Sequence, residues 1–411
     1  MPDNGSFNSE ATSTIPLELL GAIVDALAED DLPSVKACCL TCRAFVPLCR
    51  KHIFSTIVLN QSFDNAYSPT ADMFEHLILT NPTFAQYVRK IEYTILDIDV
   101  LETSLPWAFD QVAILESLSI SYQSPRVQML DWNCDLMESL GPSLLRLLRL
   151  PTLTHFGASK IKNFPAVELA RCTNIQSLDL NNVHFQEQES FPAAYLPVQL
   201  RRYCHRHGSN ISTRVLLRAQ SADGLPIFDF SEVKKAFFVI DDGANPVLEE
   251  LSRRMPNCVD VSIESVRQTI HPGQVSQLLT NCVGTLKTFT FEYFLNQENV
   301  DPLHGLVAEL RALNGQNIIE GVTLKIGMHE RIKCRLDEEW FKFDEVVTAR
   351  GWPHLRSVWF KIEVSTYEIA QSKTQFENDL EALPTTHLKR LESRKDVDIR
   401  VEIKRTPILS Y

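Results

Sequence analysis

Short apolar segments recur along most of this 411-residue chain, and they constrain its fold more than any other feature. Each follows the pattern apolar-x-x-apolar-x-apolar, in which the alternation is typical of a strand buried on one face. Several come after a helical stretch and a turn with Cys, Pro or Asn, as in EELSRRMPNCVDVSI and ARGWPHLRSVWF. The nine segments are VRKIEY from Val88, LESLSI from Leu115, LTHFGA from Leu153, IQSLDL from Ile175, VKKAFF from Val233, CVDVSI from Cys258, LKTFTF from Leu286, IEGVTL from Ile319 and LRSVWF from Leu355.

The spacing of these segments predicts a degenerate repeat of one strand and one helix. Consecutive starts differ by 22 residues (175 − 153) at the least and 58 (233 − 175) at the most, and the long interval predicts an obscure copy near Leu200 to His205. Each unit would expose an apolar face until a neighbour stacks on it, which gives a parallel sheet with helices outside. The alternating residues Val397 to Lys404 predict a final edge strand. A doubly wound α/β domain is the alternative architecture, because alternating strands and helices also fit it.

Composition and charge exclude several classes of protein. With 44% hydrophobic residues, 14 Gly and 21 Pro, the chain has globular composition, and only residues 1–13 are predicted to be disordered. The formal net charge of −12 disfavours nucleic acid and anionic lipid as partners. No segment approaches the roughly 20 apolar residues of a membrane span, and the 10 Cys form no dense disulfide framework. We therefore expect a cytoplasmic or nuclear protein that contacts no membrane.

Three short helices are predicted at the N-terminal end. Thr14 is a plausible N-cap with Pro16 near the first helical position, and apolar residues at helical spacing follow as far as Leu27. A second helix is predicted from Leu32 to about Ala44, and after Pro47 a third from Leu48 to about Phe54. The apolar residues that would form the buried stripes are Leu19, Leu20, Ile23, Val24 and Leu27 in the first helix and Val35, Cys38, Cys42 and Phe45 in the second.

This ordered set of residues resembles the F-box. The residues that carry the resemblance are Ile15, Pro16, Leu17, Glu18, Leu19, Leu20, Ile23, Leu27, Asp31, Leu32, Val35, Cys38, Cys42, Arg43, Phe45, Leu48, Arg50, Ile53 and Phe54. The resemblance implies a docking module for a Skp-type adaptor, which connects to a cullin and a RING-bearing ubiquitin ligase. The positions that match the adaptor-facing residues of the family are Pro16, Leu17, Leu19, Leu20, Ile23, Leu32, Val35, Arg43 and Phe45. The alternative is that the same apolar stripe packs on the rest of the chain as a helical cap.

The region from about Phe84 onward resembles an irregular leucine-rich repeat array, a common partner of the F-box. The predicted fold class is therefore α/β, with a small three-helix F-box in residues 14–60 and an irregular solenoid in residues 61–411 that binds a target. These resemblances imply a non-catalytic subunit that recruits a target protein, of unknown identity, to a Skp–cullin–F-box type ubiquitin ligase. Two alternatives remain open at this point: an interaction scaffold without a link to ubiquitination, and an α/β enzyme with a diverged site.

Four residues in the stretch ACCLTCRAFVPLCRKH have the chemistry of zinc ligands, namely Cys39, Cys42, Cys49 and His52. Zinc ligands lie roughly 4 Å from each other, whereas residues seven apart on an unbroken helix are separated by about 10 Å. The turn residues that usually form a zinc knuckle are also missing from this stretch. The cysteines are therefore predicted to be small apolar packing residues, with no metal and no cofactor.

Motifs of catalysis or phosphate binding do not occur in the sequence. There is no G-x-G-x-x-G, G-x-x-x-x-G-K-[ST], G-x-S-x-G or H-E-x-x-H. The segment Cys204-His-Arg-His207 is predicted to be a solvated basic loop because arginines surround it, and Asp241-Asp242-Gly243 is predicted to be a turn. Core packing is the favoured role of three tryptophans that would otherwise anchor a partner: Trp340, Trp352 and Trp359.

Overall fold

The fold is taken from a computed structural model of the whole chain. It describes residues 16–60, 70–97, 99, 104–186, 191, 196–240, 245–266, 270–297, 300–315, 317–330, 332, 335, 336, 338–366 and 375–407. The predicted disordered residues 1–13, the predicted cap Thr14 and the predicted turn Asp241–Gly243 lie outside these ranges.

A single parallel sheet of 13 strands runs through most of the described chain. Its strand order is β1-β2-β3-β5-β6-β8-β10-β11-β12-β13-β14-β15, with β4 paired to β5 beside this path, while β7 and β9 pair separately. The strands are β1 (Thr56–Leu59), β2 (Lys90–Leu96), β3 (Ser117–Gln123), β4 (Leu130–Asp131), β5 (His155–Phe164), β6 (Ser177–Phe185), β7 (Val198–Gln199), β8 (Arg202–His205), β9 (Phe228–Asp229), β10 (Lys235–Ile240), β11 (Asp260–Ser265), β12 (Thr288–Leu295), β13 (Gly321–His329), β14 (Ser357–Thr366) and β15 (Asp398–Pro407).

The strand order follows the order of the chain, so the predicted α/β class with a large parallel sheet is confirmed. A doubly wound domain reverses its strand order at a switch point, and the described path contains no such reversal. The doubly wound alternative is therefore excluded for the described residues. The predicted edge strand is confirmed as β15, which pairs with β14 from Ser357↔Asp398 to Thr366↔Pro407.

All nine apolar segments form strands of this sheet in equivalent positions. The first apolar residue of each segment lies two residues before its strand and is buried; Leu115 and Leu286, for example, are fully buried ahead of β3 and β12. The strands then pair from their first residues, as in Lys90↔Ser117, Ser117↔His155 and Asp260↔Thr288. The obscure copy expected near Leu200 to His205 is also present, as β8.

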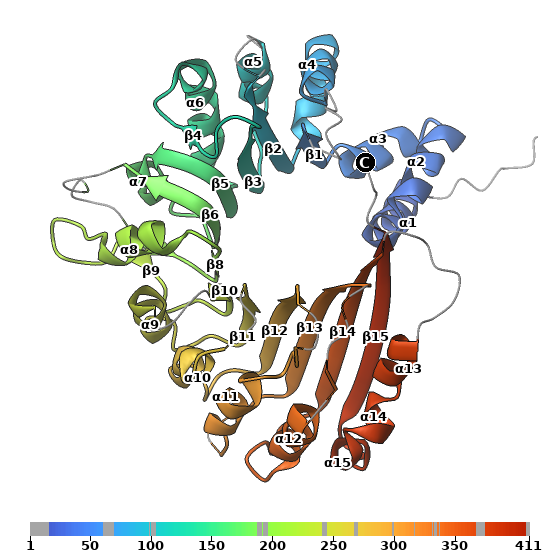
Figure 1. Cartoon of the computed structure of the whole chain (residues 1–411). Helices are drawn as coiled ribbons and strands as arrows, with labels where there is room; N and C mark the ends of the chain where they lie inside the picture. Colours follow the sequence, from blue (N-terminus) through green and yellow to red (C-terminus); the bar gives the residue numbers. More distant parts are fainter. Residues whose placement is uncertain are drawn as a thin grey trace, which may run out of the picture.

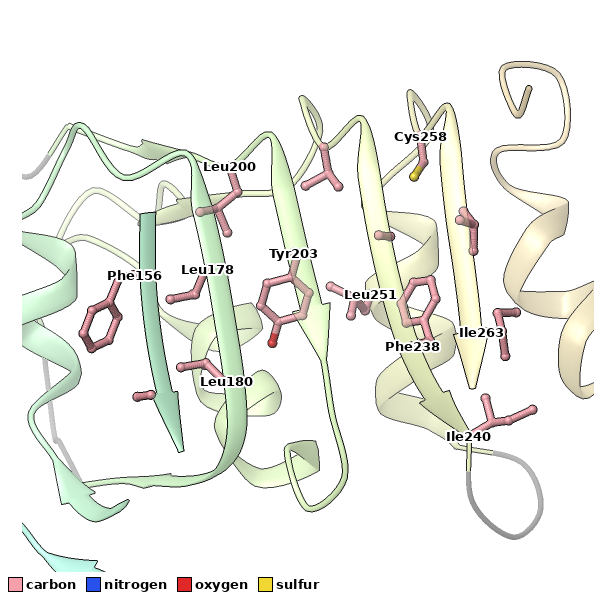
Figure 2. Close-up of a cluster of buried hydrophobic side chains, with 14 of the residues drawn as sticks. Phe156, Leu178, Leu180, Leu200, Tyr203, Phe238, Ile240, Leu251, Cys258 and Ile263 are labelled. Carbon is pink, nitrogen blue, oxygen red and sulfur yellow. The ribbon is translucent and has the colours of Figure 1, made fainter. Parts of the chain in front are cut away.

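Helices cover the outer side of the curved sheet, and the strands line its inner side (Figure 1). Figure 2 shows Tyr203, Phe238 and Ile263 from neighbouring strands on the core side, with Leu251 of a helix among them. The described helices after the first three are α4 (Thr70–Thr80), the 3-10 helix η1 (Pro82–Tyr87), α5 (Leu105–Asp110), α6 (Asp135–Leu148), α7 (Ala166–Ala170), α8 (Asn210–Arg218), α9 (Pro246–Arg253), α10 (Gln274–Thr280), α11 (Leu306–Ala312), α12 (Glu338–Thr348), α13 (Gln375–Glu381), α14 (Leu383–Thr386) and α15 (Lys389–Glu392).

A buried carboxylate joins neighbouring units in the C-terminal half. Glu309 of α11 is 3% exposed and accepts hydrogen bonds from the backbone N–H groups of Gly273, Val275 and Ser276, at 2.6, 3.0 and 2.8 Å. These donors lie at the start of α10, where the helix supplies no acceptor of its own. The side chain of one unit therefore completes the hydrogen bonding of the unit before it.

Three helices precede the sheet: α1 (Leu17–Asp30), α2 (Leu32–Thr41) and α3 (Phe45–Ile53). The predicted end of α2, at about Ala44, and the predicted start of α3, at Leu48, were wrong. The chain leaves the helical conformation at Cys42, with φ −155° and ψ 160°, and Pro47 lies within the first turn of α3, where a missing N–H costs no hydrogen bond. Cys42 is exposed as a result, so its predicted place in the buried stripe was also wrong.

The three helices surround a small core of their own, formed by Val24, Val35 and Cys49. Helix α3 connects them to the sheet. The ring of Phe54, just after α3, packs against the ring of Phe84 in η1 at 4.6 Å between centroids, and the Arg50 guanidinium lies 5.2 Å from the centroid of the same Phe84 ring. The chain then enters β1, which pairs with β2.

Candidate functional site

The first candidate surface is an apolar face on the N-terminal helices. Leu17, Leu19 and Ile23 of α1 are 55%, 56% and 48% exposed, and Leu32 at the start of α2 is 40% exposed. The predicted burial of Leu19 and Ile23 was therefore wrong within this chain. Helix α1 begins immediately after Pro16, whose ring suits a position ahead of the first turn. Several large exposed apolar side chains on one small unit typically mark an interaction surface.

The structure places the remaining predicted adaptor-facing residues in different environments. Pro16 and Arg43 are exposed, and Leu20 and Phe45 are half-buried. Val35 has no exposed surface because it packs with Val24 and Cys49, so its role in the structure is to support the helices from within. Leu40 is not among the residues that carry the F-box resemblance, but it is 89% exposed near the end of α2. Its position outside the helical spacing of Val35 and Cys38 is the signal that it faces away from the buried stripe.

An ion-pair contact links α3 to α1 within the three-helix unit. Asp25 Oδ1 lies 2.6 Å from Lys51 Nζ and 2.7 Å from His52 Nε2. Hydrogen bonds from Lys51 and His52 hold the pKa of the Asp25 carboxyl below its ordinary value. Because Asp25 is 52% exposed, this contact orients the helices more than it stabilises them.

The cysteine-rich stretch is divided between the interior and the surface. Cys49 is buried, Cys38 and Cys39 are half-buried against it, and burial raises the pKa of the Cys49 thiol. His52 is directed to Asp25. Within the described ranges, no group of three or more His, Cys, Asp or Glu side chains is arranged to hold a metal ion.

The second candidate surface is the inner face of the sheet. Along each strand, alternate residues are buried against the helices, and the residues between them face the inner side. In β3 and β5 most of the inner positions hold small residues, namely Ser117, Ser119, Ser121, Gly157 and Ser159, with His155 and Gln123 at the strand ends. From β8 onward, charged and aromatic side chains are found among these positions, including Phe237, Glu264, Lys325 and Trp359.

Ion pairs cross the inner face between strands. Just after β8, the Arg206 guanidinium donates to both carboxylate oxygens of Asp179 at 2.8 and 2.9 Å and lies 5.1 Å from the centre of the Phe237 ring. Lys325 Nζ lies 3.2 Å from Glu292 Oε2. Burial and the neighbouring Glu292 raise the pKa of Glu264, in that order of size.

The three tryptophans divide between the core and the inner face. Trp340 and Trp352 are fully buried, so their predicted core role is confirmed. Trp359 is half-buried on the inner side of β14, so its predicted core role was wrong, and Lys361 Nζ lies 3.5 Å from its ring centroid. A cation held over an aromatic face in this way is a favourable contact.

The predicted basic loop at Cys204–His207 was wrong for its first half. Cys204 and His205 belong to β8 and are each 2% exposed, while Arg206 leaves the strand and pairs with Asp179. His205 Nδ1 lies 2.8 Å from Thr213 Oγ1, which in turn lies 2.7 Å from the Tyr203 hydroxyl. Burial lowers the pKa of His205 to about 4, so the ring is neutral near pH 7 and serves this buried network.

Comparisons with known proteins supply no relative. A scan against protein-family models finds no match, and a search of curated proteins also finds none.

In the part of the chain that the structure describes, no helix has the length and apolar character needed to cross a membrane.

Proposed function

We propose that the protein is the substrate-recognition subunit of a Skp–cullin–F-box type ubiquitin ligase. In this proposal α1–α3 form an F-box-like module that binds the adaptor, and the curved sheet is an irregular leucine-rich-repeat-like solenoid that holds a target protein on its inner face. The protein itself is non-catalytic: it raises the effective concentration of the target's lysines near the activated ubiquitin.

The observation that carries the proposal is the exposure of the apolar face on α1 and α2. Leu17, Leu19 and Ile23 remain about half exposed although a large sheet is attached to the same unit. The attachment to the sheet uses Arg50 of α3 and Phe54 just after it, and none of these exposed residues. This arrangement favours a separate partner over the intramolecular cap, because the cap would cover these side chains.

Covering these side chains would contribute favourably to docking of a partner. Full burial of a Leu or Ile side chain contributes about 1.5–3 kcal/mol, and these side chains already have roughly half of that surface covered. Burial of the four exposed residues would therefore contribute several kcal/mol before the cost of association. The residues Leu17, Leu19, Ile23 and Leu32 are accordingly the proposed anchors of the adaptor contact.

The test is binding of the full chain to a purified Skp-type adaptor. We expect direct binding by the unmodified chain and a loss of about 100-fold for Ile23→Asp, since a buried unpaired carboxylate replaces an apolar anchor. The matched control is Ile211→Asp: Ile211 is 54% exposed on α8, close to the 48% of Ile23, and lies outside the proposed surface.

Two results would overturn the proposal. The first is that the unmodified, folded chain does not bind the adaptor. The second is that Ile23→Asp and Ile211→Asp bind equally well. A non-catalytic scaffold without a link to ubiquitination shares the same inner face, and a folded chain that captures partners but never the adaptor would favour that alternative.

A further inference from the structure

An exposed aromatic ring lies across the inner face of the sheet between β12 and β14. Phe294 is 56% exposed, although its neighbours on β12, Tyr293 and Leu295, are buried on the other side. Its ring lies over Gly327 of β13: a Cβ at Gly327 would come 2.6 Å from Phe294 Cδ2. Only glycine leaves room for the ring there, so the ring forms a platform that extends over β13.

Carboxylates flank this platform on both sides. Glu363 of β14 is exposed and is the register partner of Gly327, which in turn is the register partner of Phe294. On the other side, Glu292 precedes Phe294 by two residues on the same face, and Glu264 is the register partner of Glu292 on β11. Like charges directly opposite each other on a sheet are unfavourable, and the raised pKa of Glu264 reflects this together with its burial.

The nearby lysines neutralise this site only in part. Lys325 pairs with Glu292 at 3.2 Å, and Lys361 is directed toward the Trp359 ring at 3.5 Å. Lys404 of β15 is exposed and is the register partner of Glu363, but it forms no ion pair with it within 4 Å. Among the described residues, Glu264 and Glu363 have no ion-pair partner within 4 Å. An aromatic face with an exposed carboxylate at its edge is complementary to a cation that is also flat, because a guanidinium stacks on a ring and pairs with a carboxylate at once.

We propose that the inner face of β11–β14 is a docking surface for a basic segment of a partner protein, with an arginine side chain stacked on Phe294 and paired with Glu363. The net charge of −12 attracts such a segment at long range. The seventh residue is Gln123 in β3 and the buried Ile161 in β5, where β12 has Phe294 and β14 has Glu363, so β3 and β5 take no part in this site. If the proposed function holds, the segment belongs to the target protein; the docking itself does not require the adaptor.

The test measures binding of a fluorescein-labelled decapeptide of alternating arginine and glycine to the full chain, by fluorescence anisotropy at 0.15 M salt. Phe294→Ala and Glu363→Gln should each weaken binding about five- to tenfold. The matched controls are Phe341→Ala, since Phe341 is 50% exposed on α12, and Glu392→Gln, since Glu392 is exposed on α15. Both controls should change the affinity less than twofold. Gly327→Ala, which displaces the ring, should resemble Phe294→Ala.

The outcomes separate this proposal from simple charge attraction. Equal weakening by Glu363→Gln and Glu392→Gln would show that only net charge matters and would overturn it, as would unchanged affinity in Phe294→Ala, or failure of the unmodified chain to bind the peptide. Circular dichroism checks that each variant is folded. Adaptor binding, measured on the same variants, should stay unchanged, so failure of the adaptor proposal and failure of this one are told apart.

Discussion

The N-terminal helices and the curved sheet bury their apolar residues in opposite ways. The core of α1–α3 consists of Val24, Val35 and Cys49, whereas the core of the sheet runs without interruption from Leu59 to Val397. The helices expose Leu17, Leu19 and Ile23, while the sheet directs every second strand residue into its helix layer.

This difference shows which part of the molecule covers its own apolar surface and which part does not. Each strand and helix of the sheet is covered by the next unit, so stability comes from contacts between neighbours. The three helices are too small to cover their own apolar surface, since units of this size bury a low fraction of it. The helices are therefore the part that gains most from a partner. The predictions below test this contrast, from the largest expected effect to the smallest.

The largest effect is expected from a cavity in the core of the sheet. Phe343 of α12 is fully buried, and its ring lies edge-on to Phe360 of β14 at 5.8 Å. Phe343→Ala should lower the free energy of unfolding by about 3–5 kcal/mol. Phe341→Ala, on the same helix but half exposed, should lower it by less than about 1 kcal/mol. Urea unfolding followed by circular dichroism compares the two, and equal effects would contradict a packed core at α12.

A smaller effect on stability is expected from removing the carboxylate that accepts hydrogen bonds from the neighbouring unit. Glu309→Ala leaves the N–H groups of Gly273, Val275 and Ser276 without their acceptor and should cost about 2–3 kcal/mol. Glu392→Ala removes an exposed carboxylate from α15 and should change stability by less than about 0.5 kcal/mol. Hydrogen exchange should show the loss concentrated at the start of α10. Uniform loss across the sheet would argue against local coupling between units.

Low pH should reduce the free energy of unfolding because His205 is buried in its neutral form. Its pKa is lowered from 6.5 to about 4 in the folded state, so the unfolded chain takes up the proton first, and stability falls as pH drops from 6.5 toward 4. At pH 5 this contribution amounts to about 2 kcal/mol. His205→Asn should unfold with a shallower dependence on pH over this window in thermal melts recorded from pH 7 to pH 4.5. An unchanged slope would show that His205 is not the group responsible.

The smallest effect is expected on the N-terminal helices. The pKa of Asp25 is lowered by Lys51 and His52, so its contribution is present above the ordinary carboxyl pKa and is lost as pH falls through the lowered value. Because the pair is half exposed, Asp25→Asn should cost less than about 1 kcal/mol at pH 7. Thermal melts at pH 7 with the Asp25→Asn variant check this. A loss as large as that of Phe343→Ala would erase the contrast between the two regions.

Much of the sheet could be predicted from the sequence because its signal is local. Alternating apolar residues after a turn determine which face of a strand is buried, and the same pattern identified nine strands of the sheet. The helix ends near Cys42 could not be found in this way, because the apolar spacing continues through a residue whose backbone is extended. At Cys204 and His205, neighbouring arginines suggested a solvated loop. The two residues instead belong to β8, which pairs with β6 on one side and β10 on the other, and both are buried.

The inner-face surface could not be predicted from the sequence, because it depends on the register between strands and no local pattern gives that register. Phe294 and Gly327 lie 33 residues apart in the chain (327 − 294), and only the pairing of β12 with β13 brings the ring over the glycine. The apolar face of the helices was recognised as a set of residues, but the burial of Val35 and the exposure of Leu40 depend on how α1, α2 and α3 pack together.

Hydrogen–deuterium exchange of the full chain, with and without a purified Skp-type adaptor, tests the central claim most directly. We predict that the adaptor slows exchange of backbone amides in α1 and α2, above all at residues 17–35, and leaves β2–β15 unchanged. Absence of protection in α1 and α2 at saturating adaptor, or protection confined to the sheet, would contradict the account.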